Sequence, residues 1–194
     1  MTRTYAMSGN CEGVEIVEPP GMGNIVLTGM MGTGKTAVGR YLAEQFKVPF
    51  YDLDELIEQE SGLNIPTIFR EQGETVFRTL EREVVSRLCE LQGCIIATGG
   101  GTIVNPANLR RLQKHGEILC LTAAPERILE RVEGMEHRPL LWHADKLGRI
   151  REVMQGRAAV YAQVGEAIDT TDLSVEEVAA RVLARINIHE VLKG

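Results

Sequence analysis

The sequence lacks the features that mark secreted, membrane-spanning or nucleic-acid-binding proteins. Its 194 residues contain no apolar run near the length of a membrane span, and the N-terminal segment shows no apolar core of a signal peptide. The net charge is -6 and no basic stripe occurs, which argues against nucleic acid as a partner. We therefore expect a soluble cytoplasmic protein without a membrane or nucleic-acid partner. No oligomerisation surface is visible, so a monomer is the default expectation.

Cysteine is also scarce, with only Cys11, Cys89, Cys94 and Cys120 in the chain. Cys89 and Cys94 are close enough in sequence to suggest half of a metal clip, but no second Cys or His pair stands at a matching spacing. Cys94 and Cys120 lie in apolar runs typical of strands. We therefore expect buried, reduced thiols rather than metal ligands.

What is present fits one globular α/β domain, because 44% of the residues are hydrophobic and 25% are charged. Strand and helix patterns alternate from residue 24 onward, which predicts a five-stranded parallel sheet in a three-layer α/β/α arrangement. The predicted strands are 24–28, 49–52, 94–98, 117–121 and 167–169. The predicted helices are 34–46, 54–61, 65–89 with a break near Gly73, 107–115, 126–132, one within 144–164, and 175–192.

Two segments fall outside this alternation. Residues 1–23 show neither a helical nor a strand period, and we expect a mobile extension that precedes a single domain at 24–194; folding back onto a sheet edge is the alternative. Residues 133–143 (EGMEHRPLLWH) have poor periodicity, and a loop of this length within a compact domain is often functional. By contrast, Ser174 followed by Glu177 predicts a capping box at the start of the last helix.

The most specific motif is GMMGTGKT at residues 29–36, which fits the phosphate-binding pattern G-x-x-x-x-G-K-[ST]. It lies between the predicted strand 24–28 and the predicted helix 34–46, as such a loop requires. A glycine-rich turn without a ligand is the alternative, and the strand-loop-helix context argues against it. The motif predicts binding of a nucleoside triphosphate.

Each residue type in this loop has a physical reason. Gly29, Gly32 and Gly34 allow successive backbone N–H groups to point inward, and the helix N-terminus adds partial positive charge. Lys35 would reach the outer phosphates, and the Thr36 hydroxyl would ligate Mg²⁺. The predicted nucleotide-binding residues of this segment are Gly29, Gly32, Thr33, Gly34, Lys35, Thr36 and Ala37.

The second predicted strand ends in Asp52-Leu53-Asp54. The carboxyl ends of parallel strands face the ligand crevice, and alternation along a strand would place both carboxylates on one side. Two acids facing phosphates need either a metal ion or a hydroxyl donor between them. One would therefore lie near Mg²⁺ and the other would accept a substrate hydroxyl. Alternatively, Asp54 caps a helix that has Glu55 in its first turn.

Arg78 and Glu81 are three residues apart in GETVFRTLE, so they share one face of a helix. Such a pair is often a solvated ion pair of little energetic value. The functional alternative is that Arg78 binds a carboxylate through both branches of its guanidinium group while Glu81 orients it.

Three glycines and two further arginines complete the candidate site. Gly99, Gly100 and Gly101 follow a buried strand, where a ligand could approach the backbone closely. Arg138 precedes a proline within the loop 133–143 and could close over the triphosphate. Arg157 lies on a predicted helix; single arginines of this kind are more often surface charges.

Together these motifs resemble the shikimate kinase family of small P-loop kinases. The resemblance covers roughly residues 24 to 190 and includes, in order, D-x-D, G-E-x-x-F-R-x-x-E, the triple glycine, R-P-L-L and a later Arg with Tyr. It implies a nucleoside-monophosphate-kinase-like fold and ATP-dependent phosphorylation of shikimate to shikimate 3-phosphate in aromatic amino-acid biosynthesis. It also implies that residues 54–93 are substrate-binding helices and that 133–143 form a lid.

The resemblance assigns roles residue by residue. Asp54 matches the proposed base that meets the ring hydroxyls, Arg78 and Arg157 match the carboxylate clamp, and Glu81 matches the acid beside them. The three glycines match the backbone wall of the pocket. Its apolar lining is matched by Ile65, Phe69 and Phe77.

On the nucleotide side, Lys35 matches the phosphate lysine, and Thr36 and Asp52 match the magnesium residues. Arg138 matches the lid arginine, and Arg131 matches an arginine near the adenine. The departures are small: Leu53 replaces a common Ser or Thr, the N-terminal extension is unusual, and His137 and Trp142 near the lid have no assigned role.

Two other functions are compatible with parts of the pattern. A gluconate-type or nucleotide kinase would share the P-loop and the lid, but not the paired arginines together with the triple glycine. A non-catalytic nucleotide-binding homologue would usually lack an acid or the lysine, and this chain has both.

Overall fold

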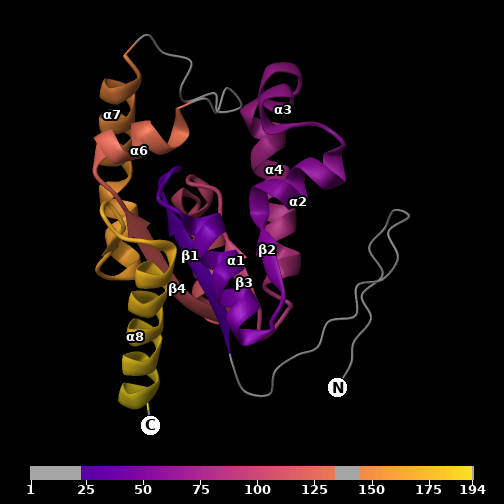
Figure 1. The fold of residues 1–194 in the computed structure, drawn as a ribbon. Coiled ribbons are helices and arrows are strands. Elements are labelled where there is room, and N and C mark those ends of the chain that lie inside the picture. The colour runs from indigo at the N-terminus through magenta and orange to yellow at the C-terminus, as the bar shows by residue number, and fades with distance from the viewer. Residues whose placement is uncertain (1–22, 134–144, 194) are drawn as a thin grey trace.

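The computed structural model describes residues 23–133 and 145–193, and within them it shows an α/β fold built on one five-stranded sheet (Figure 1). The strand order is β2-β3-β1-β4-β5, and all paired strands are parallel. The strands are β1 Asn24–Gly29, β2 Phe50–Asp52, β3 Ile95–Ala97, β4 Gly116–Thr122 and β5 Ile168–Asp169. The helices are α1 Lys35–Phe46, α2 Leu53–Ser61, α3 Ile65–Glu71, α4 Gly73–Leu88, α5 Pro106–His115, α6 Pro125–Val132, α7 Lys146–Tyr161 and α8 Val175–Lys193.

The predicted order and type of elements are therefore confirmed, with boundaries that shift by one or two residues. The predicted break near Gly73 separates α3 from α4, and Gly73 has a φ of 85°, a conformation that glycine adopts readily. The predicted capping box at α8 is present: Ser174 N–H donates to Glu177 Oε2 at 2.7 Å, and Glu177 N–H donates to Ser174 Oγ at 3.2 Å.

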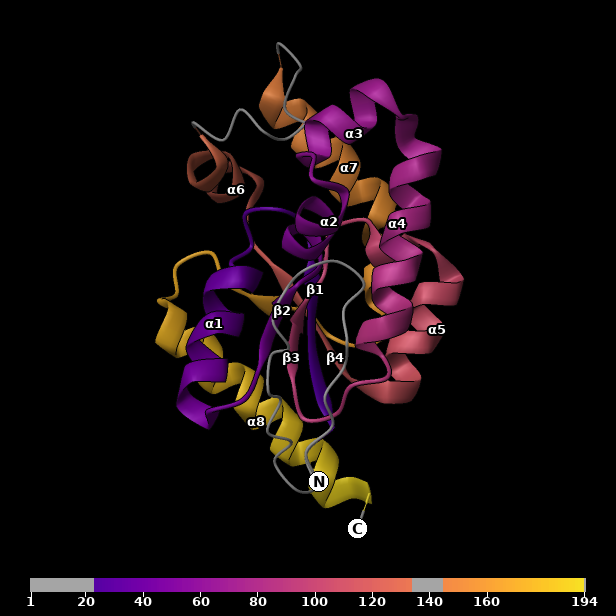
Figure 2. The ribbon, with the colours of Figure 1, turned by 90° about the vertical axis from the view of Figure 1, so that its right-hand side faces the viewer.

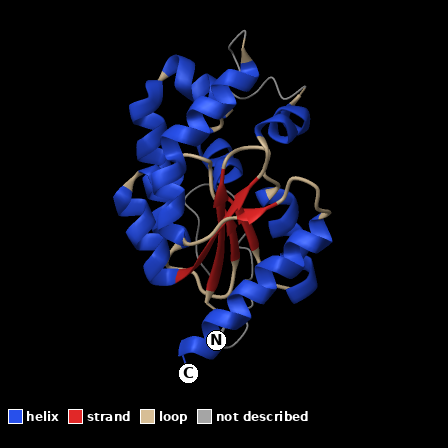
Figure 3. Ribbon diagram, turned by 90° about the vertical axis from the view of Figure 1, so that its left-hand side faces the viewer, coloured by secondary structure: helices blue, strands red, loops and turns tan. Residues whose placement is uncertain are grey.

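Helices cover both faces of the sheet, as a parallel sheet requires (Figures 2 and 3). On one face, Ile25, Leu27 and Leu121 of the sheet pack with α1 and α8. On the other face, Val26 and Ile96 pack with α2, α3, α4 and α5. The alternation of neighbours 25, 26 and 27 between the two cores is the period of two expected for a strand buried on both faces.

A third apolar cluster lies beyond the carboxyl end of β1. It contains Met30 of the phosphate loop, Ile128 and Val132 of α6, and Ile150 of α7. This cluster fixes α6 and α7 next to the phosphate loop (Figure 1).

The cysteines behave as buried thiols where the structure describes them. Cys89, Cys94 and Cys120 are buried and free, whereas Cys11 lies outside the described residues. Burial raises the pKa of Cys89 to about 11, of Cys94 to about 12 and of Cys120 to about 11. No group of three or more His, Cys, Asp or Glu side chains suited to a metal occurs in the described part of the chain.

None of the helices in 23–133 and 145–193 combines the length and apolar character needed to cross a membrane. The predicted extension 1–23 lies outside the described residues except for Gly23, and so do residues 134–143 of the predicted lid.

Candidate functional site

The phosphate loop begins at the carboxyl end of β1 and leads directly into α1. Gly29, Gly32 and Gly34 have φ values of 130°, 73° and 93°, which side-chain-bearing residues rarely adopt. A Cβ at Gly29 would also lie 2.0 Å from the Leu121 carbonyl oxygen. No side chain caps the described N-terminus of α1, so no capping side chain competes with a ligand for its first N–H groups. The predicted strand-loop-helix arrangement is confirmed, whereas phosphate binding by the loop stays a prediction.

Lys35 is buried and folds back along the loop. Its Nζ donates to the carbonyl oxygens of Gly29 at 2.9 Å and Met30 at 2.8 Å, and the Thr33 hydroxyl donates to Met30 O at 2.8 Å. These bonds hold the ammonium group against the backbone of the loop.

Asp52 connects the phosphate loop to the first helix of the pocket. Its Oδ2 accepts from the Thr36 hydroxyl at 2.7 Å, and its Oδ1 accepts from the N–H groups of Asp54 at 3.0 Å and Glu55 at 3.4 Å. Asp52 is therefore the N-cap of α2, and the alternative that Asp54 is the cap is wrong. Burial raises the pKa of Asp52, opposed by the Thr36 hydrogen bond.

Thr36 and Asp52 suit a magnesium ion by their donor chemistry. Both present hard oxygen atoms at one point, and Mg²⁺ is usually held by one or two protein groups together with waters and substrate phosphates. A dedicated cage of three or more protein acids is not needed, and none is present among the described residues.

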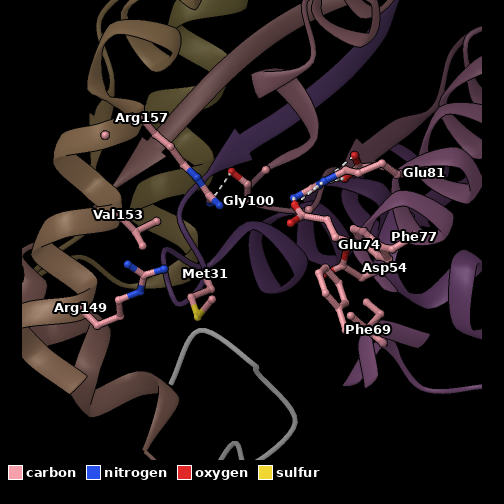
Figure 4. A pocket seen from close by; sticks show the side chains of 15 residues that line it. Met31, Asp54, Phe69, Glu74, Phe77, Glu81, Gly100, Arg149, Val153 and Arg157 are labelled. Carbon is pink, nitrogen blue, oxygen red and sulfur yellow. Dashed lines mark hydrogen bonds and ion pairs between the residues drawn. The ribbon is translucent and has the colours of Figure 1, made fainter. Parts of the chain in front are cut away.

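A cavity of about 480 Å³ opens beside the phosphate loop (Figure 4). It is bounded by α2, α3 and α4 on one side and by α7 on the other. All ten residues predicted to bind substrate line it: Asp54, Ile65, Phe69, Phe77, Arg78, Glu81, Gly99, Gly100, Gly101 and Arg157. The remaining lining residues are Met31, Glu74, Arg149, Val153 and Gly156.

Arg78 is held by acids on two sides. Its Nη1 donates to both carboxylate oxygens of Glu81, at 3.2 and 3.0 Å, and Glu81 is only 1% exposed. Glu81 also accepts from the Thr102 hydroxyl at 2.9 Å. Burial raises the pKa of Glu81, and the Arg78 charge opposes that shift. The pair is therefore a fixed element of the pocket wall rather than a solvated surface pair.

Side chains of α2, α4 and α7 approach the backbone of the glycine run 99–101, which follows β3. A Cβ at Gly99 would lie 2.6 Å from Asp54 Oδ1, and a Cβ at Gly101 would lie 3.1 Å from the terminal nitrogens of Arg78. The Gly100 carbonyl accepts from Arg157 Nη1 at 2.9 Å and from the Tyr161 hydroxyl at 2.6 Å. A residue with a Cβ at 99 would displace the Asp54 carboxylate, and one at 101 would crowd the Arg78 guanidinium group.

Arg131 lies beside the phosphate loop and does not line the cavity. Its guanidinium group donates to the carbonyls of Gly32 at 3.2 Å and Thr170 at 2.6 Å, and to the Thr170 hydroxyl at 3.0 Å. It therefore joins the phosphate loop to the turn after β5, and its role near adenine stays a prediction. Arg138, His137 and Trp142 lie outside the described residues.

Two charged residues that line the pocket, Glu74 and Arg149, were not predicted from the sequence. Glu74 stands four residues before Arg78, and its Oε1 accepts from Arg78 Nε at 3.2 Å and Nη2 at 3.0 Å. Arg149 stands eight residues before Arg157, with Val153 midway. The helical spacing of four was the available signal for both residues.

Comparison with known proteins agrees with this geometry. The family model described as shikimate kinase matches residues 31–187. A shikimate kinase of Caldanaerobacter subterraneus subsp. tengcongensis is 43% identical over 162 residues, covering 84% of this chain and 95% of that protein. The solved shikimate kinase from Acinetobacter baumannii, in complex with shikimate, is 35% identical with a TM-score of 0.83, over 87% of this chain and 94% of that one. The enzyme from Aquifex aeolicus gives a TM-score of 0.73 at 32% identity, over 88% and 99% of the two chains.

Proposed function

Because the chain belongs to the shikimate kinase family, we propose that it transfers the γ-phosphoryl group of ATP to a hydroxyl of shikimate, giving shikimate 3-phosphate and ADP. The observation that carries this proposal is that the predicted nucleotide site and the predicted acceptor site lie next to each other. The phosphate loop and a cavity lined by all ten predicted substrate residues share the carboxyl end of the sheet. The reaction belongs to aromatic amino-acid biosynthesis.

In the acceptor pocket, Arg78 and Arg157 bind the shikimate carboxylate. Both guanidinium groups lie against the glycine run, within 3.5 Å of a Cβ position at Gly101. Arginine suits this task because its planar fork matches a carboxylate. Ile65, Phe69 and Phe77 cover the apolar face of the ring, and Glu81 holds Arg78 in place.

Asp54 accepts a hydroxyl proton of shikimate. As that hydroxyl oxygen forms its bond to the γ-phosphorus, the bond from phosphorus to the β–γ bridging oxygen breaks and ADP leaves with the electron pair. Phosphoryl transfer is loose, so positioning and charge neutralisation matter more than the strength of the base. Asp54 lies at the right edge for this role because Gly99 permits its carboxylate to approach the strand end.

On the donor side, the loop N–H groups and Lys35 bind the phosphates of ATP. Thr36 and Asp52 would hold Mg²⁺, which neutralises phosphate charge when bound. Arg131 is assigned to the nucleotide side, and Arg138 to a lid at 133–143 that excludes water. We also assign residues 24–194 to one kinase domain, with 54–93 as substrate helices, acting as a cytoplasmic monomer.

The same observations give less support to the two alternative functions. A gluconate-type kinase has no need for two arginines directed at one glycine run, because its substrate presents a different arrangement of hydroxyls around its carboxylate. A non-catalytic homologue would have no reason to keep Lys35, Asp52 and Asp54 together around the loop.

The test is ADP release from ATP and Mg²⁺ with shikimate, gluconate, nucleoside monophosphates or no acceptor. We expect release that depends on shikimate alone. Release with another acceptor, or without any, would leave the phosphate loop assigned and refute the acceptor pocket.

A further inference from the structure

Arg149 lines the cavity, and the proposed reaction does not assign it a role. It is the fourth residue of α7, lines the cavity, and extends from the helix toward Met31 of the phosphate loop (Figure 4). Its Nη1 pairs with Glu152 Oε2 at 2.6 Å, and the Glu152 side chain is 70% exposed. One of its terminal nitrogens is thus anchored from the solvent side while the rest of the group reaches inward.

The Nε atom of Arg149 is buried and has no hydrogen-bond partner within the described residues. A buried donor without an acceptor costs free energy, and an unpaired one next to a cavity indicates a missing ligand acceptor. The missing partner must be an acceptor, because arginine carries donors only. Its positive charge favours an anion.

The position of Arg149 separates it from the carboxylate clamp. Arg149, Val153 and Arg157 form one stripe along α7, and eight residues span roughly 12 Å of helix. Arg157 is directed to the Gly100 carbonyl, whereas Arg149 is directed to Met31 (Figure 4). The two arginines therefore serve opposite ends of the pocket, and Arg149 serves the end where the phosphoryl group enters.

We propose that Arg149 binds the transferred phosphoryl group on the acceptor side, and so holds the phosphate of shikimate 3-phosphate. This inference rests on the proposed function, because it needs a phosphorylated acceptor in this cavity. The product carries two anionic groups, and Arg78 and Arg157 account for one of them. Arg149 accounts for the other with Nε and the remaining terminal nitrogen, a fork that matches two phosphate oxygens.

The test compares Arg149→Gln with the wild type by measuring dissociation constants for shikimate 3-phosphate, shikimate and ATP separately. We expect at least tenfold weaker binding of shikimate 3-phosphate, since charge-assisted hydrogen bonds are lost, with shikimate and ATP affinities within about twofold. The reverse reaction, from shikimate 3-phosphate and ADP, should slow in parallel.

Arg151→Gln is the matched control. Arg151 lies on the same helix, is exposed, and pairs with Glu126 of α6 outside the cavity. This variant should bind all three ligands as the wild type does. Arg149→Lys keeps a charge but loses the fork; it should show an intermediate loss and carries the test if the glutamine variant does not fold.

Three results would overturn the inference: unchanged affinity for shikimate 3-phosphate, an equal loss for shikimate, or a loss confined to ATP. An equal loss for shikimate would place Arg149 in the carboxylate clamp. A wild-type protein without shikimate-dependent ADP release would refute the proposed function itself, which separates the two failures.

Discussion

The Thr36 hydroxyl and the Asp52 carboxylate are joined by a 2.7 Å hydrogen bond across the boundary between the phosphate loop and the acceptor pocket. The other oxygen of Asp52 caps α2, the helix that carries Asp54. One carboxylate thus links the hydroxyl assigned to Mg²⁺ with the helix that carries the assigned proton acceptor.

Asp52→Asn should separate the charge of this residue from its structural role. Asparagine is an equally good N-cap through its amide oxygen, and its amide nitrogen can donate to the Thr36 hydroxyl oxygen, so the melting temperature should change little. Loss of the negative charge should weaken Mg²⁺ binding about 10- to 100-fold. The measurement is shikimate-dependent ADP release as a function of Mg²⁺ concentration, with thermal unfolding followed in parallel. An unchanged Mg²⁺ requirement would remove Asp52 from the metal site.

Asp54→Asn should lower kcat by about 10²- to 10⁴-fold, because the amide cannot accept the hydroxyl proton. The side chain keeps its size, so it still fits against Gly99 and the protein should fold. Steady-state kinetics and circular dichroism test both points. Turnover near that of the wild type would exclude Asp54 as the proton acceptor.

Arg78→Lys should weaken shikimate binding about tenfold or more and leave ATP binding intact. Lysine keeps the charge beside the buried Glu81 carboxylate, so folding is preserved, but it cannot offer two parallel donors. Calorimetric titration with each ligand measures the effect. The assignment to the carboxylate clamp fails if shikimate affinity is unaltered.

Glu74→Gln should strengthen shikimate binding by about two- to fivefold. Glu74 Oε1 accepts from Nε and Nη2 of Arg78, which are donors that a substrate carboxylate needs. The Glu74 side chain is 65% exposed, so removing its charge should cost little stability. Glu71→Gln is the control, because Glu71 pairs with Arg70 on the surface. Weaker shikimate binding in Glu74→Gln would show that Glu74 supports the clamp instead.

Burial of Cys89, Cys94 and Cys120 predicts that the stability of the folded protein falls at alkaline pH. Burial raises their pKa values to about 11 and 12 from an ordinary 9.0. Their contribution to stability is therefore complete below about pH 9 and is lost as pH rises through 11 to 12.

In a Cys11→Ser variant we expect slow reaction with a disulfide reagent at pH 8 and rapid reaction of three thiols in urea. Rapid labelling of the native protein would contradict their burial.

Much of the site was predictable because it is encoded in local patterns. The phosphate loop, the Arg78–Glu81 spacing and the glycine run each lie within ten residues, where backbone preference and helical period act directly. The family resemblance then predicted which of these segments share one pocket. Asp52 was correctly placed beside Thr36, but its role as the cap of α2 was missed, since capping depends on where the strand stops.

The sequence by itself determined the order of elements and the phosphate loop, and the family resemblance predicted the ten residues that line the cavity. The tertiary structure alone decided how those residues are held: Asp52 bridges Thr36 and α2, Tyr161 and Arg157 share the Gly100 carbonyl, and Arg149 faces Met31. These contacts join segments that are far apart in the chain. The positions of Arg157, Tyr161 and Arg149 depend on how α7 packs against the phosphate loop through the cluster of Met30, Ile128 and Ile150, and no local pattern specifies that packing.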